Sequence, residues 1–99
     1  MVVGILKVIL HFPYLDSLKG KRRILNSLKQ NLKHKYNISI SEVDDKDLWQ
    51  KSLMGISMIG ESKKFIERNF SRIIDHCGRL KDGYLVRYHS EFLHLAGEE

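Results

Sequence analysis

The chain has 99 residues, a net charge of +5 at neutral pH, 42% hydrophobic and 29% charged residues, and one cysteine. This length fits a single domain over residues 1–99 with one core, and the composition excludes an intrinsically disordered chain. One cysteine excludes a disulfide scaffold and a cysteine-rich zinc module, and it suits a reducing compartment.

The apolar start of the chain resembles a secretory signal only in part. Residues 1–12 lack a cationic first segment and a small-residue cleavage site, and Lys7 interrupts the apolar run. No segment reaches the roughly 20 apolar residues that are needed to cross a bilayer. We therefore expect a cytoplasmic protein that has no membrane contact.

The first predicted element is a buried strand over residues 2–12, which are rich in Val and Ile. Alternation along a strand puts two sets of side chains on opposite faces. One face would carry Gly4, Leu6, Val8, Leu10 and Phe12. The other would carry Val3, Ile5, Lys7, Ile9 and His11. Pro13 ends the strand because it has no N–H to donate.

Residues 17–36 predict an amphipathic helix. Its apolar side chains fall in one arc of about 120°, and they are Leu18, Ile24, Leu25, Leu28, Leu32 and Tyr36. Ser17 is placed to cap the N-terminus of this helix, and Asn37 is placed to end it in a left-handed conformation.

The charge of this predicted helix is unusual. Seven of the chain's 17 Lys and Arg residues lie between Lys19 and Lys35, and no Asp or Glu lies between Ser17 and Ser41. Lys21 and Lys35 point toward the apolar side, but they lie near the two ends, where long side chains reach water. The cations on the outer side are Lys19, Arg22, Arg23, Lys29 and Lys33. Because the remainder of the chain is slightly acidic, the electric field of the protein has a direction.

Four further elements follow. Residues 38–43 and 51–59 predict two strands joined by the turn residues Asp44–Asp47. Residues 62–77 predict a second helix that buries Cys77 and stops at Gly78. Residues 84–93 predict the last strand, and residues 96–99 a frayed tail.

This order, βαββαβ, predicts an α+β fold of the ferredoxin-like class, with two helices on one face of a four-stranded antiparallel sheet. The other face of the sheet would then expose Val3, Ile5 and Ile9 to water, which is unfavourable. Two outcomes fit this face: a homodimer through the sheet or its edges, which we favour, or a binding platform.

Two strings of residues, together with Gly4 and His11, resemble the YlxP-like bacterial family of unknown function. The strings are Ser17-Leu-Lys-Gly-Lys-Arg-Arg23 and Glu42-Val-Asp-Asp-Lys-Asp-Leu-Trp-Gln50. The resemblance covers residues 1–93 and implies a ferredoxin-like fold. It also implies work on RNA or the ribosome, because genes of this family commonly neighbour those of translation initiation and ribosome-binding factors.

This chain departs from the family at one position of the first string. The family more often has an acid where this chain has Gly20. The departure removes the partner that would complete a capping box with Ser17, and it removes a negative charge beside four cations. The resemblance supplies no catalytic residues.

The basic helix predicts an anion-binding site with ribosomal RNA as the favoured ligand. Its residues are Lys19, Lys21, Arg22, Arg23, Lys29 and Lys33. A solvated helix face is the alternative, but such faces usually intersperse Glu for pairing with Lys or Arg. The central strands lack aromatic residues for base stacking, so we expect phosphate contacts, and we expect Trp49 to be an anchor at the edge of the core.

Other functions find less support in the sequence. The acids Glu42, Asp44, Asp45 and Asp47 lack the spacing of an EF-hand, so we expect a solvated turn and no metal. Phosphate-loop, cofactor and catalytic motifs are absent, so we expect no cofactor and no enzymatic activity. An enzyme would need a pocket of Lys7, His11, His89 and Glu91, in which the two histidines face each other. The main alternative is a homodimeric protein-interaction module whose basic helix docks on an acidic protein.

Overall fold

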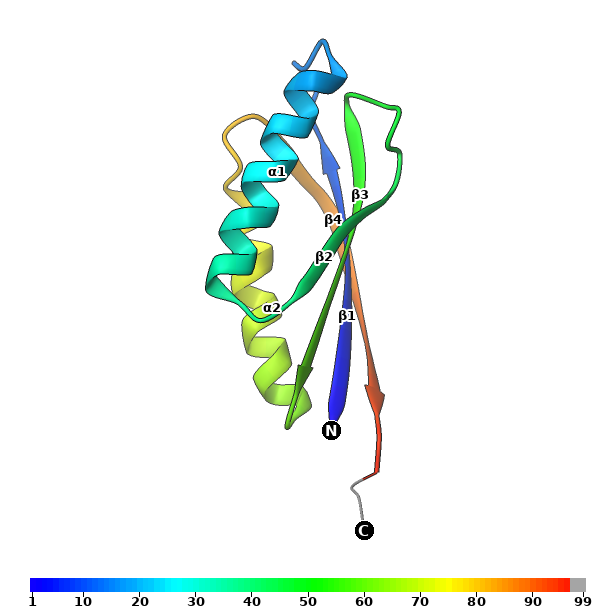
Figure 1. Ribbon diagram of the computed structural model, residues 1–99, viewed down its shortest axis with the longest axis vertical. Helices are drawn as coiled ribbons and strands as arrows, with labels where there is room; N and C mark the ends of the chain where they lie inside the picture. The colour runs from blue at the N-terminus through cyan, green and yellow to red at the C-terminus, as the bar shows by residue number, and fades with distance from the viewer. Residues whose placement is uncertain (97–99) are drawn as a thin grey trace.

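The computed structural model describes residues 1–96, and it contains the six predicted elements in the predicted order (Figure 1). The strands are β1 (Val2–His11), β2 (Ser39–Asp44), β3 (Lys51–Gly60) and β4 (Tyr84–His94). The helices are α1 (Leu18–Lys35) and α2 (Lys63–Gly78). Each predicted element agrees with the observed one to within one residue at either end. The predicted frayed tail falls largely on residues 97–99, which lie outside the described residues.

The four strands form one antiparallel sheet in the order β2-β3-β1-β4. Both helices cover the same face of this sheet (Figure 1), so the predicted ferredoxin-like fold is confirmed. The core lies between the helices and the sheet. β1 buries one set of alternate side chains there, as its sequence pattern predicts: Leu6, Val8 and Leu10 are fully buried, and Phe12 follows at the strand end.

The helices contribute the opposing half of the core. The buried residues of α1 include Leu25, Leu28 and Leu32. Those of α2 are Ile66, Phe70, Ile73 and Cys77. Burial raises the pKa of the Cys77 thiol to about 11, which agrees with its predicted role as a small core residue.

Gly4 lets α2 approach β1 closely. A Cβ atom at this position would lie 2.5 Å from Cγ2 of Ile66 and 3.0 Å from the ring of Phe70. The absence of a side chain is therefore a packing requirement, and it accounts for one residue of the family resemblance.

Serine side chains cap both helices. Ser17 Oγ accepts a hydrogen bond from the backbone N–H of Gly20 at 3.1 Å, and Ser62 Oγ accepts one from Phe65 at 3.2 Å. The predicted left-handed stop at Asn37 is wrong, because Asp45 is the one non-glycine residue in the described part of the chain with a positive φ. Instead Tyr36 packs against the core with extended backbone, which leads the chain from α1 toward β2.

No helix covers the second face of the sheet (Figure 1). The predicted second set of β1 side chains lies there: Ile5, Lys7 and His11 are exposed, and Val3 and Ile9 are partly buried. The edge strand β4 is paired only with β1, and most of its side chains are exposed.

Candidate nucleic-acid interface

The outer face of α1 carries most of the predicted phosphate-binding residues. The helix packs on the sheet through its leucines, which leaves Lys19, Arg22, Arg23 and Lys33 exposed and Lys29 partly buried. None of these five cations forms a salt bridge with a carboxylate among residues 1–96. Their charges are therefore not neutralised by this part of the protein.

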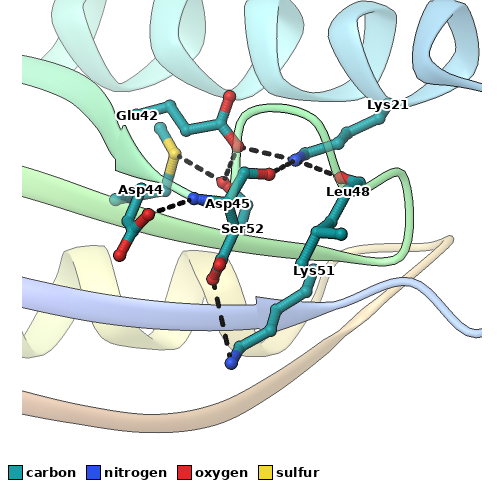
Figure 2. A network of polar contacts seen from close by, with 8 residues as sticks. Lys21, Glu42, Asp44, Asp45, Leu48, Lys51 and Ser52 are labelled. Carbon is teal, nitrogen blue, oxygen red and sulfur yellow. Dashed lines mark hydrogen bonds and ion pairs between the residues drawn. The ribbon is translucent and has the colours of Figure 1, made fainter.

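Lys21 does not belong to this surface (Figure 2). Its side chain is only 1% exposed, and its Nζ lies 2.7 Å from Oε2 of Glu42. Nζ also donates to the backbone carbonyls of Asp45, at 2.6 Å, and Leu48. The prediction that Lys21 reaches water and binds phosphate is wrong, because the loop between β2 and β3 supplies a carbonyl acceptor for each ammonium proton that Glu42 does not take.

A hydrogen-bond network extends from Glu42 into the sheet and along the loop (Figure 2). Ser52 of β3 is fully buried, and its Oγ lies 2.6 Å from the same Oε2 atom of Glu42. Asp45 is in the left-handed region with φ of 63°, and its backbone N–H donates to Oδ1 of Asp44 at 2.8 Å. Every buried side-chain nitrogen and oxygen within residues 1–96 has a hydrogen-bond partner. Glu42, one of the acids that were predicted to form a solvated turn, therefore takes part in a structural ion pair.

A second set of contacts ties this loop to the segment before α1. The backbone N–H of Phe12 donates to the carbonyl of Gln50 at 2.8 Å. The side-chain amide of Gln50 donates to the carbonyls of Pro13, at 3.3 Å, and Leu15, at 3.4 Å. The two strings that carry the family resemblance thus meet at one end of the molecule. We name the pairing of Lys21 with Glu42, Asp45 and Leu48 the lysine clamp.

Sequence patterns contained a signal for the lysine clamp. The helical arc placed Lys21 toward the apolar side of α1, and strand alternation places Glu42 on the same face as the buried Ile40. Two opposite charges that both point inward indicate a buried ion pair, since an unpaired charge is costly to bury.

Trp49 lies on the outside of the same loop, where it is 46% exposed beside Leu48 at 51%. The prediction that Trp49 anchors the edge of the core is wrong, because its side chain is one of the exposed large hydrophobics and lines a surface hollow, while the backbone around it is held by Lys21 and Gln50. A surface hollow of about 380 Å³ lies here and is lined by His11, Asp47, Leu48, Trp49, Gln50 and Lys51. We call it the Trp49 hollow.

Three of the four side chains of the pocket that an enzyme was expected to need, Lys7, His89 and Glu91, line a surface hollow of about 200 Å³ together with Ile5, and His11 does not. His89 lies opposite Lys7 in the β1–β4 pairing, whereas His11 lies opposite Tyr84, so the predicted contact between the two histidines is wrong. A β-bulge in β4 contributes to this register. His89 Nε2 instead lies 3.0 Å from Oε2 of Glu91 on the exposed sheet face.

The pKa of His76 in α2 is shifted by its surroundings. Its pKa is lowered from the usual value mainly by burial, and further by the positive charges of Lys35 and Arg79.

Within residues 1–96, no three His, Cys, Asp or Glu side chains lie close enough together to hold a metal ion. Neither of the two described helices has the length and apolar character that crossing a membrane requires.

Comparison with known proteins identifies the family. Residues 3–90 match the family described as "Protein of unknown function (DUF503)". The chain belongs to this family. It is 34% identical over 58 residues to the uncharacterized protein YlxP of Bacillus subtilis (strain 168), which confirms the YlxP-like resemblance. The matched region covers 59% of this chain and 63% of the length of YlxP.

A solved structure shares the fold of this DUF503 member. The de novo designed protein Foldit4 is 15% identical with a TM-score of 0.56, over 97% of this chain and 100% of that one. A dimeric ferredoxin-like protein from an uncultured marine organism is 10% identical with a TM-score of 0.48, over 100% of both chains. The identity to Foldit4 is so low that this likeness indicates the fold alone.

Proposed function

We propose that this protein is a cytoplasmic RNA-binding protein that contacts phosphates through the outer face of α1, in association with the ribosome or its assembly. The observation that carries this proposal is the set of five α1 cations, Lys19, Arg22, Arg23, Lys29 and Lys33, that form no salt bridge within residues 1–96. From Lys19 to Lys33 they extend over about 21 Å of helix. A stripe of this kind favours a polyanion over a single small anion.

The N-terminal end of α1 strengthens the attraction. No acid lies in the first turn, and Gly20 stands where the family more often has one. The positive end of the helix dipole lies in the same place and favours a bound anion. We propose a binding role without catalysis, because contacts between these cations and phosphates need no general acid or base.

Affinity for a structured fragment of ribosomal RNA should fall steeply as salt is raised. Five phosphate contacts predict a slope of about −4 when log affinity is plotted against log salt concentration. The measurement is fluorescence anisotropy of end-labelled RNA across a salt series. A slope near zero, or no binding near physiological salt, would contradict the proposal.

A second function is supported by the uncovered sheet face. Ile5, Ile59 and Leu93 are each more than half exposed on or beside this face, and β4 has one unpaired edge. Long exposed edge strands are templates for pairing with another chain. We therefore propose as the alternative a homodimer through β4 and the open face, with α1 docked on an acidic protein.

Sedimentation equilibrium of the purified protein should then give twice the monomer mass. Leu93→Lys places a charge on the edge strand, so it should shift the equilibrium toward monomer. An acidic partner should also remain bound to the protein after nuclease treatment. A monomer mass at all protein concentrations would contradict the proposed homodimer. Release of the partner by nuclease would favour the RNA-binding function over the protein-interaction module.

A further inference from the structure

The Trp49 hollow combines an exposed aromatic face with polar groups of both signs. The indole of Trp49 and the side chain of Leu48 supply the apolar surface. Lys51 and His11 supply nitrogen atoms, and Asp47 supplies a carboxylate. The Nζ of Lys51 lies 3.8 Å from Oδ2 of Asp45, a loose contact that leaves its ammonium exposed to water. Exposed apolar surface rimmed by polar groups is typical of a binding site.

The loop that carries Trp49 is fixed from two sides. The lysine clamp holds the carbonyls of Asp45 and Leu48 (Figure 2). The side-chain amide of Gln50 holds those of Pro13 and Leu15. A large aromatic side chain on a loop held in this way loses little conformational entropy when a ligand packs against it. The protein therefore presents a partly exposed indole on a preorganised support.

We propose that the Trp49 hollow binds one unpaired nucleobase of the RNA whose phosphates contact α1. The base stacks on the indole, and Leu48 packs against its edge. The carboxylate of Asp47 accepts a hydrogen bond from a donor group of the base, and Lys51 lies where it can contact the adjoining phosphate. This inference rests on the proposed function and narrows it to RNA with single-stranded or bulged positions.

The lysine clamp joins the N-terminal end of α1 to the loop that carries Trp49, so the two parts of this interface lie at the same end of the molecule. Lys21 extends inward from the N-terminal end of α1 to the loop, and Lys19, Arg22 and Arg23 lie on the exposed side of the same end of the helix. Lys46 adds an exposed cation within the loop itself. A strand that contacts these cations can therefore place one base in the hollow. A fully paired duplex cannot, because its bases are stacked within the helix.

Intrinsic fluorescence tests this inference directly, because Trp49 is the one tryptophan of the chain. A single-stranded RNA oligonucleotide should quench the emission of Trp49 as it binds. The duplex of the same sequence should bind, as followed by anisotropy of the labelled RNA, and leave the emission unchanged. Trp49→Leu keeps an apolar side chain and should weaken single-strand binding about tenfold or more. The same substitution should leave duplex binding unchanged.

Tyr14→Leu is the matched control. Tyr14 is 86% exposed on the segment that Gln50 holds, but it does not line the hollow, so this substitution should leave both affinities unchanged. Single-strand binding with a steep salt slope, without quenching and without an effect of Trp49→Leu, would overturn the inference and leave the α1 interface in place. Absence of binding by either RNA would overturn both.

Discussion

Replacement of Lys21 by methionine should lower the free energy of unfolding by about 3 kcal/mol or more. The substitution keeps the apolar length of the side chain but removes the ammonium group, which is 1% exposed and paired at 2.7 Å with Glu42. Glu42 is itself only 16% exposed, so its carboxylate would remain largely desolvated with Ser52 as its single donor. The carbonyls of Asp45 and Leu48 would lose a donor as well. Urea denaturation followed by circular dichroism measures the change.

Lys19→Met is the control for the lysine clamp. It makes the same chemical change at an exposed position of the same helix, and it should alter stability by no more than about 0.5 kcal/mol. The double variant Lys21→Met/Glu42→Leu should recover part of the loss, because apolar residues often replace a buried ion pair at little cost. Equal effects of Lys21→Met and Lys19→Met would show that the clamp does not stabilise the fold.

Local and periodic patterns explain why so much of the fold could be predicted. The alternation of β1 identified the buried face that carries Leu6, Val8 and Leu10. The helical spacing of α1 identified Leu25, Leu28 and Leu32, and the two serines marked both helix starts. Because each of these signals acts over a few residues, the element order and the ferredoxin-like fold follow from the sequence alone.

Contacts between distant segments could not be predicted in this way. Helical spacing put Lys21 toward the apolar side of α1, and strand alternation puts Glu42 on the face of Ile40, but neither pattern shows that the two side chains meet. For the same reason the patterns could not show how the loop is held, and Trp49 was placed wrongly at the edge of the core. Alternation shows which face a side chain lies on but not which residues of β1 and β4 pair, so His11 and His89 were placed together wrongly, although they lie four residues apart in the register. One of the predicted phosphate-binding residues, Lys21, is buried and therefore does not belong to the set. The other five are exposed or partly buried.

Charge reversal on α1 should have the largest effect on function. The triple variant Lys19→Glu, Arg22→Glu and Arg23→Glu should lower RNA affinity about 100-fold or more near physiological salt, because three attractive contacts become repulsive. The slope of log affinity against log salt should become shallower by about two to three. Acids near a helix N-terminus are neutral or stabilising, so the loss of affinity should occur without unfolding. Anisotropy titrations with the labelled ribosomal RNA fragment measure both quantities.

The matched control reverses three cations on the other helix. Lys64, Arg68 and Arg72 of α2 are also exposed, and their replacement by Glu changes the net charge by the same amount. α2 carries Glu67 and Asp75 among its cations, so it has no unbroken basic face, and its triple variant should lose much less affinity. Equal losses in the two triple variants would mean that the RNA responds to the overall charge of the protein. The α1 face would then not be a distinct binding site.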